Sequence, residues 1–383
     1  MSASKQHIAF LTGTRADYGK IKPLILAAHD NGFRVTVFAT GMHMLERFGS
    51  TILEVKRTLP VEVQIIPFEN QVVGDPMDIV VANTITGISR FIQEFHPDLL
   101  VVHGDRPEAL AGAISGALTN TRVVHIEGGE LSGTIDGVIR HAVSKLSHIH
   151  LVANEDAQKR LLQLGENQQT IHIIGSPDLD IMLSPNLPHL DEAKTRYEIS
   201  FSDYFIAIFH PVTTDPEASS VATKEFVDAL LESGENFVVI HPNNDTGFET
   251  IINQYQRLEK VGERFRQFES LRFEHFLVLL RNSLGIVGNS SAGIREAPLY
   301  GVPSIDVGDR QRGRHEGDTI TQVPATAPEI ISALRHAKTQ GRVGENTVFG
   351  DGQSTERFTE LLLSGVLFQA PVDKVFVDLK DVM

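Results

Sequence analysis

The 383-residue sequence contains no cysteine and no tryptophan. The absence of cysteine excludes disulfide bonds, thiol nucleophiles and cysteine metal sites. Long apolar runs are absent too, and the N-terminal run His7–Leu11 is too short for a signal peptide or a membrane span. We therefore expect a cytoplasmic protein with no membrane partner.

Basic residues are scarce: 34 Lys and Arg stand against 49 Asp and Glu, a formal net charge of −15. This charge argues against nucleic acid as a partner. An acidic protein that binds an anionic ligand must gather its arginines locally, so each arginine near a predicted strand end is a candidate for such a site.

The chain is long enough for two domains, and its 41% hydrophobic and 22% charged residues are typical of a globular protein. Apolar runs alternate with amphipathic segments, which predicts an α/β fold of two doubly wound, Rossmann-like domains facing a cleft. We expect strands at His7–Leu11, Arg34–Thr40, Val61–Phe68, Leu99–His103, Val123–Glu127, His150–Ala153, Ile171–Ile174, Tyr204–Phe209, Asn236–Ile240, Leu284–Val287 and Ser304–Val307. We expect helices that include Tyr18–His29, Met77–Phe95, Pro107–Leu118, Val138–Leu146, Glu155–Leu164, Thr223–Glu232, Phe273–Arg281, Ala292–Tyr300 and Thr355–Leu363.

This pattern predicts an N-terminal domain at residues 1–175 and a C-terminal domain at residues 176–354. Ser184–Pro188 contains two prolines and is punctuated like a linker. Residues 355–383 begin with a helix that we expect to cross back to the first domain.

Two acidic residues close neighbouring apolar runs: Asp105 follows Leu99–His103, and Glu127 ends Val123–Glu127. The proline at the start of Pro107–Leu118 suits the first turn of a helix between them. A strand–helix–strand unit makes the two strands parallel neighbours, so both carboxylates should emerge at the carboxyl edge of one sheet. Ligands of open α/β sheets bind at that edge.

The first loop carries Arg15 and Lys20 beside two glycines. It fails as a P-loop, because its glycine spacing is one residue too long and Ile21 replaces the Ser or Thr that would hold magnesium. A glycine turn feeding a helix N-terminus still suits a phosphate. An ordinary turn with two exposed cations is the alternative.

A second candidate anion site follows Leu284–Val287, where Ser290 and Ser291 open a predicted helix. Glu296 lies early in that helix and would suit the vicinal hydroxyls of a ribose. Arg310 follows the strand at Ser304–Val307, in a position to neutralise a diphosphate. A capped helix and a solvated basic loop are the alternatives.

His210 ends a predicted strand, and Thr213 and Thr214 add polar groups beside it. A histidine there could bind a phosphate or transfer a proton. Asp136 is expected near a helix N-terminus, where capping is its simplest role. No pattern of histidine or acidic ligands has metal spacing, so we expect no metal.

Several strings occur in a fixed order along the sequence. They are His103-Gly-Asp-Arg106, His125-Ile-Glu-Gly-Gly-Glu130, Gly133-Thr-Ile-Asp136, His210-Pro-Val-Thr-Thr214, Pro242-Asn-Asn-Asp-Thr-Gly247 and Gly288-Asn-Ser-Ser-Ala-Gly-Ile-Arg-Glu296. Together they resemble those of the hydrolysing UDP-N-acetylglucosamine 2-epimerases of sialic acid biosynthesis, including bacterial capsule enzymes and the epimerase half of the animal bifunctional enzyme. The resemblance extends from about Ile8 to the predicted helix Thr355–Leu363.

The resemblance implies a fold similar to glycosyltransferase B and a homodimer or homotetramer. It implies that UDP-N-acetylglucosamine and water become N-acetylmannosamine and UDP, without a cofactor or metal. UDP would leave by elimination to a 2-acetamidoglucal, which water then hydrates with inverted stereochemistry at C2.

The resemblance also assigns roles to individual residues. It implies that Asp136 is a third catalytic acid beside Asp105 and Glu127, with His210 as a further catalytic residue. Crowded carboxylates favour one that holds a proton while another acts as base. The residues implied to bind UDP or the sugar nucleotide are Arg15, Lys20, Arg106, His210, Asn243, Phe276, Ser290, Ser291, Glu296 and Arg310.

Three alternatives remain open from the sequence. The first is a non-hydrolysing epimerase that adds UDP back to the glycal. The second is a hydrolysing epimerase for a nucleotide-linked 2,4-diacetamido-6-deoxy sugar of a legionaminic-type pathway. The third is a sugar-nucleotide sensor without catalysis, against which the three acids argue.

Overall fold

The protein divides into two compact units in a computed structural model that describes residues 5–132, 135–212, 215–243, 245–313 and 317–378. Unit 1 comprises Met1–Glu130, Asp136–Ser184 and Val348–Met383, and unit 2 comprises Leu131–Ile135 and Pro185–Thr347. The expected boundary between residues 175 and 176 thus falls inside unit 1. Helix α7 (Pro177–Met182) causes the difference, because it packs against α1 (Arg15–Asp30) and buries Leu179 and Met182.

Unit 1 is built on a seven-stranded parallel sheet with the order β3-β2-β1-β4-β5-β6-β7. The sequence order reverses between β1 and β4, which creates a switch point at the carboxyl edge where such sheets bind ligands. The strands are β1 (His7–Thr12), β2 (Arg34–Ala39), β3 (Gln64–Pro67), β4 (Leu99–His103), β5 (Arg122–Ile126), β6 (Ile149–Val152) and β7 (Ile171–Ile173).

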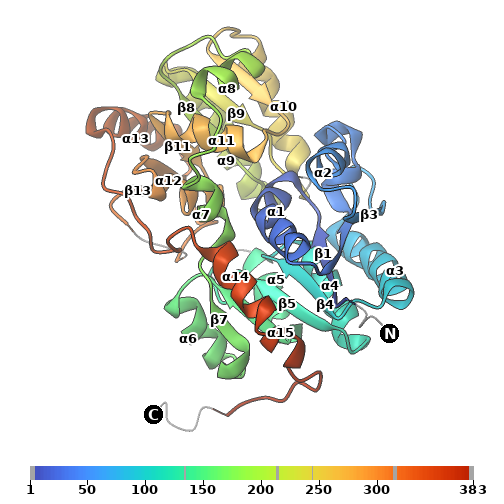
Figure 1. Cartoon of the computed structure of the whole chain (residues 1–383). Coiled ribbons are helices and arrows are strands. Elements are labelled where there is room, and N and C mark those ends of the chain that lie inside the picture. Colours follow the sequence, from blue (N-terminus) through green and yellow to red (C-terminus); the bar gives the residue numbers. More distant parts are fainter. Residues whose placement is uncertain (1–4, 133–134, 213–214, 244, 314–316, 379–383) are drawn as a thin grey trace. The chain divides into compact units, whose positions relative to one another are not determined.

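Helices cover the sheet of unit 1, and the last two return from the far end of the chain. Phe358 of α14 lies edge-on to Phe10 of β1, with 6.4 Å between ring centroids, so the C-terminal helices belong to the core of this unit. Figure 1 shows α14 beside α1 and α7. The remaining helices are η1 (Gly41–Met44), η2 (Glu46–Phe48), α2 (Ile52–Thr58), α3 (Met77–Phe95), α4 (Pro107–Leu118), α5 (Ile135–Leu146), α6 (Glu155–Gln163), η3 (Gln168–Thr170), α14 (Ser354–Leu363) and α15 (Val366–Gln369).

Unit 2 repeats the same topology with six parallel strands in the order β10-β9-β8-β11-β12-β13. Its switch point lies between β8 and β11. Phe205, Phe237 and Phe265 stand side by side on three adjacent strands, with ring centroids 6.0 and 5.7 Å apart. The strands are β8 (Phe205–Ile208), β9 (Phe237–Ile240), β10 (Phe265–Phe268), β11 (Gly285–Gly288), β12 (Ser304–Val307) and β13 (Ile320–Val323). Two parallel Rossmann-like sheets confirm the predicted fold class.

One predicted helix of unit 2, Ala292–Tyr300, is wrong as a continuous element. The chain forms the short 3₁₀ helix η4 (Ser291–Gly293) and the four-residue α12 (Glu296–Leu299). Gly293 lies so close to β12 that a Cβ there would be 2.4 Å from Ser304 Oγ, and Pro298 lacks a backbone donor. The other helices are α8 (Leu190–Arg196), α9 (Pro216–Ser233), α10 (Phe248–Glu259), α11 (Phe273–Arg281) and α13 (Ala327–Gln340).

Among the residues that the structure describes, no helix has both the length and the apolar character needed to cross a membrane.

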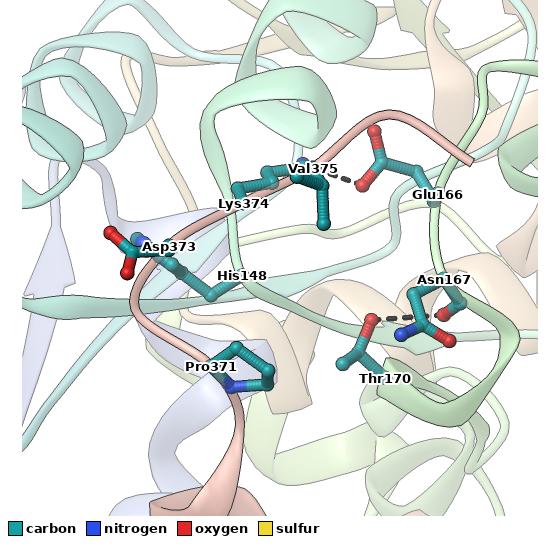
Figure 2. A pocket seen from close by; sticks show the side chains of 8 residues that line it. All are labelled: His148, Glu166, Asn167, Thr170, Pro371, Asp373, Lys374 and Val375. Carbon is teal, nitrogen blue, oxygen red and sulfur yellow. Dashed lines mark hydrogen bonds and ion pairs between the residues drawn. The ribbon is translucent and has the colours of Figure 1, made fainter.

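The tail after α15 lines a small, open pocket of unit 1 beside the buried carboxylate of Glu166 (Figure 2). Glu166 accepts hydrogen bonds from Lys145 Nζ at 3.1 Å and His150 Nε2 at 3.0 Å, and Lys374 Nζ of the tail lies at 2.5 Å. Lys374 also donates to the carbonyls of Ser144 and Ser147 at the end of α5. Burial alone would raise the pKa of Glu166, but His150 and Lys374 outweigh it and the pKa is lowered.

We expect Lys374→Met to destabilise the protein by about 1–3 kcal/mol, because the helix-end carbonyls and the buried Glu166 lose a partly exposed donor. The lowered pKa of Glu166 means that its contribution is complete above the ordinary value of 4.5 and is lost as the pH falls below it. Urea unfolding at neutral pH and at pH near 4 measures both effects. Lys159→Met removes only an exposed ion pair and is the control. Equal stability of the two variants at neutral pH would contradict the expectation.

Candidate active site

Asp105 and Glu127 emerge at the same edge of the sheet of unit 1, as the sequence predicts. Their strands β4 and β5 are parallel neighbours, and His103 pairs in register with Ile126. Asp105 follows the switch point between β1 and β4. The alternation of buried strand and helix is thus sufficient to bring these two acids to one edge.

Arg140 links the two strand ends and is only 1% exposed. Its Nη2 donates to Oδ2 of Asp105, and its Nη1 donates to the backbone carbonyl of Glu127 at 2.7 Å. Nη1 also lies 3.9 Å from Oε2 of the buried Glu130. One guanidinium therefore holds the side chain of one predicted catalytic acid and the backbone of the other.

Glu127 is buried, with 3% of the residue exposed, and each oxygen of its carboxylate has a polar neighbour. Oε1 accepts a hydrogen bond from Ser176 Oγ, and Oε2 lies 3.3 Å from Nε2 of His103. Glu127 has a φ of 64°, a left-handed backbone conformation that a non-glycine residue adopts only at a cost. Its backbone N–H donates to Leu151 at 3.0 Å, which anchors it to the next strand.

Asp136 is the second residue of α5 and so lies inside the first turn, not before it as a cap would. It precedes Arg140 by four residues, so both lie on one face of the helix. Residues 133 and 134 of the same string lie outside the described part of the chain. The helix thus carries one predicted acid and the arginine that binds another.

The predicted phosphate-binding cations of the first loop each lie beside an acid of unit 1. Arg15 Nε lies 2.9 Å from Oε2 of Glu54, and Lys20 Nζ donates to Oδ2 of the buried Asp178 at 3.0 Å. Thr14 caps α1 in a reciprocal capping box with Asp17. The side chains of Thr14 and Asp17 thus bind some of the backbone N–H groups at the N-terminus of α1, which we expected to face a phosphate.

A buried carboxylate that we did not predict, Glu108, lies in the first turn of α4 at the same edge. Its Oε2 lies 3.7 Å from Nε of Arg106, a predicted nucleotide contact. A Cβ on Gly13 would be 2.8 Å from Cδ of Glu108, and one on Gly41 only 2.5 Å from Oε1. Glycine at the ends of β1 and β2 therefore makes room for this acid.

In unit 2, Asn289 joins the ends of β8 and β11 at the second switch point. Its side chain accepts from the N–H of His210 at 2.7 Å and donates to the carbonyl of His210 at 2.9 Å. Nδ1 of His210 accepts from the backbone N–H of Asn243 at 3.3 Å, so a neutral ring carries its proton on Nε2. Gly288 permits this approach, since a Cβ there would be 1.8 Å from the carbonyl oxygen of Ile208.

Arg310 lies at the same switch point and donates to the carbonyl of Asn289 at 3.1 Å, and Gln311 donates to it at 2.9 Å. Burial raises the pKa of Asp306 to about 7, although the charge of Arg310 opposes that rise. A carboxyl group that is easily neutralised repels a bound anion less than an ionised one. The structure thus brings together His210, Asn243 and Arg310 of the predicted set.

The other predicted contacts of unit 2 occupy different surroundings. Ser290 caps η4 by accepting from the N–H of Ala292 at 3.3 Å, and Ser291 begins η4. Glu296 is 4% exposed at the start of α12. Phe276 is 7% exposed and stacks on Phe273, so most of its ring belongs to the core. Thr213 and Thr214 lie outside the described residues.

Sequence reasoning gave no role to Arg140, Ser176, Glu108 or Asn289. Arg140 carried a usable signal, because it follows Asp136 at helical spacing. Asn289 stands inside the string around Ser290 and Ser291, where a strand-end asparagine could have been noted. Ser176 carried none, since its partner Glu127 lies 49 residues away in the sequence. Glu108 carried none, since the glycines that make room for it, Gly13 and Gly41, lie far from it in the sequence. Within the described residues, no cluster of three or more histidine or acidic side chains could hold a metal ion.

Comparison with known proteins places the chain in a family. The family model for UDP-N-acetylglucosamine 2-epimerase matches residues 26–363. The UDP-N-acetylglucosamine 2-epimerase of Neisseria meningitidis serogroup B is 48% identical over 378 residues, which cover 98% of this chain and 99% of that protein. The UDP-N,N'-diacetylbacillosamine 2-epimerase (hydrolyzing) of Legionella pneumophila is 32% identical and covers 93% of this chain and 95% of its own.

The fold also matches that of a solved structure. The crystal structure of the Methanocaldococcus jannaschii UDP-GlcNAc 2-epimerase in complex with UDP-GlcNAc and UDP has a TM-score of 0.80 to this protein, at 20% identity, covering 94% of this chain and all of that one. At 20% identity this structural match shows the fold alone. The sequence matches above show the family. The chain is therefore an enzyme of the UDP-N-acetylglucosamine 2-epimerase family.

Proposed function

We propose that the protein is a hydrolysing epimerase that converts UDP-N-acetylglucosamine and water to N-acetylmannosamine and UDP, for sialic acid biosynthesis. The observation that carries the proposal is the arrangement at the edge of unit 1, where Arg140 and Ser176 hold Asp105 and Glu127 in place. The 48% identical relative supports the substrate, and the relative named as hydrolysing supports the reaction type.

We assign proton transfer to the predicted catalytic acids and the departure of UDP to the predicted UDP-binding residues. One of the three acids Asp105, Glu127 and Asp136 takes the proton from C2 while the C1–O bond to UDP breaks, which leaves a C1=C2 double bond in the glycal. Water then adds its hydroxyl to C1, and C2 receives a proton on the opposite face. Arg310, His210 and the Ser290 and Ser291 hydroxyls stabilise the departing diphosphate together with Arg15.

The two acids suit different tasks because their partners differ. Arg140 is a permanent cation beside Asp105, whereas Glu127 faces a hydroxyl and the titratable ring of His103. A carboxylate beside a fixed cation stays charged and stabilises positive charge that develops at C1. A carboxylate beside groups that exchange protons is suited to transferring one.

We expect the purified protein to release UDP and N-acetylmannosamine from UDP-N-acetylglucosamine with no added metal or nicotinamide. Proton NMR in heavy water is the measurement, and the product should carry deuterium at C2. An epimerised UDP-sugar without free sugar would instead identify a non-hydrolysing epimerase. A product without deuterium at C2 would exclude the elimination route.

A second candidate substrate is a UDP-linked 2,4-diacetamido-6-deoxy sugar, favoured by the Legionella pneumophila relative. The same NMR assay with both sugar nucleotides decides between them. The proposal requires the larger kcat/KM for UDP-N-acetylglucosamine, and the reverse order would assign the protein to the diacetamido sugar.

A further inference from the structure

The orientation of Glu127 depends on contacts from distant parts of the chain. Its left-handed backbone places the side chain on a turn directly after β5, where no regular element continues. The carboxylate is nevertheless buried: Oε1 accepts a hydrogen bond from Ser176, and Oε2 lies 3.3 Å from Nε2 of His103. Ser176 follows Glu127 by 49 residues, so this contact exists only in the folded unit.

Ser176 itself is fully buried and lies just after β7, at the residue that precedes α7. Pro177 follows it, which restricts Ser176 to the extended conformation that it shows, with φ −93° and ψ 127°. Its backbone N–H donates to the carbonyl of Phe349 at 2.8 Å. The hydroxyl is therefore presented to Glu127 by a backbone that is fixed on both sides.

The chain that returns to unit 1 at Val348 packs directly on this loop. A Cβ on Gly350 would be only 3.1 Å from Cα of Gly175 and 3.2 Å from N of Ser176. Asp180 of α7 accepts hydrogen bonds from the N–H groups of Ser354 and Thr355, at 2.9 and 2.6 Å, which ties the start of α14 to the same loop. The returning segment thus leaves the loop little freedom to move.

The segment of residues 175–180 also contacts Lys20, a residue predicted to bind phosphate. Asp178, two residues after Ser176, is fully buried and pairs with Lys20 of α1 at 3.0 Å. One short segment therefore contacts a predicted catalytic acid through Ser176 and a predicted phosphate contact through Asp178. Precise placement of reacting groups has large effects on rate, because an error of about 1 Å costs about 10²-fold.

We propose that Ser176 is a positioning residue for Glu127: its hydroxyl orients the carboxylate for proton transfer. This inference rests on the proposed function, because that function identifies the proton that Glu127 transfers as the one at C2 of the sugar. The hydroxyl touches no reacting atom and acts through Glu127. The segment Val348–Ser354 supports this role, because it packs against the backbone of Ser176 and fixes it.

The test is Ser176→Ala, with Ser176→Cys as a variant of similar size and weak donor strength. We expect both to lower kcat about 10-fold with little change in KM, the scale of a hydrogen bond to a charged group. The acidic limb of the kcat profile should move to higher pH, because the lost bond favoured the ionised form. Ser147→Ala is the matched control, since Ser147 is equally buried and its hydroxyl bonds only the carbonyl of Val143.

A double-mutant cycle with Glu127→Gln separates positioning from a loss of fold. We expect Ser176→Ala to have little further effect on kcat in the Glu127→Gln background, whereas additive losses, or an unmoved pH limb in Ser176→Ala, would overturn the proposal. Thermal unfolding of the same four proteins measures the coupling without any substrate, and no coupling there would also overturn it. Failure of the proposed function is seen separately, in a wild-type protein that releases no N-acetylmannosamine.

Discussion

We expect Asp105→Asn and Glu127→Gln each to lower turnover by about 10²-fold or more, the scale of a lost acid–base group. Asparagine keeps the shape of Asp105 but removes the charge that faces Arg140, and glutamine removes a proton acceptor beside His103. Both substitutions preserve volume, so the protein should fold.

Single-turnover formation of UDP, measured after quenching the enzyme, tests this prediction, because it is independent of product release. Asp98→Asn is the matched control: Asp98 precedes β4 at the opposite end and accepts from the N–H of His7 at 2.7 Å, a bond that asparagine retains. The control should keep near-normal turnover. If Asp105→Asn or Glu127→Gln also kept it, the residue concerned would have no part in the chemistry.

Arg140→Met combines a large loss of stability with a large loss of activity. Arg140 is almost fully buried among Asp105, Glu130 and the carbonyl of Glu127. Removing one partner of a buried ion pair leaves an uncompensated charge and costs about 3–5 kcal/mol. Turnover should fall by about 10²-fold or more, because the two acids lose their common anchor.

Urea unfolding and turnover of the surviving folded fraction test this expectation together. Arg140→Lys keeps the charge but cannot form the forked contact, so we expect it to restore stability more than activity. Arg57→Met is the control, since the Arg57 side chain bonds only an exposed carbonyl of its own helix. Stability and turnover near wild type in Arg140→Met would show that the acids are positioned without it.

Most secondary structure follows from local patterns in the sequence. Helices α3, α4 and α11 and strands β4 and β12 match the predicted bounds, because their buried faces are long and regular. Strands β10 and β13 were not predicted, since each is a four-residue edge strand with polar residues at its centre. Pairing with a neighbouring strand, not local propensity, makes such segments strands.

Some residues of the candidate site could likewise be placed from the sequence, and others could not. Asp105 and Glu127 could be placed at one edge because they end consecutive parallel strands, which is a local pattern plus one rule of topology. Lys20 beside Asp178 and Ser176 beside Glu127 could not be predicted, because these pairs are separated by 158 and 49 residues. No periodicity or motif links residues that far apart.

The sequence by itself determined the fold class, the strand ends that carry acids and cations, and the resemblance to the epimerase family. Only the tertiary structure decided which groups hold those acids: Arg140 across two strand ends, and Ser176 fixed by the returning C-terminal segment. The physical reason is that strands and helices arise from the order of neighbouring residues. Hydrogen bonds and ion pairs between side chains of distant segments arise only when packing brings those segments together.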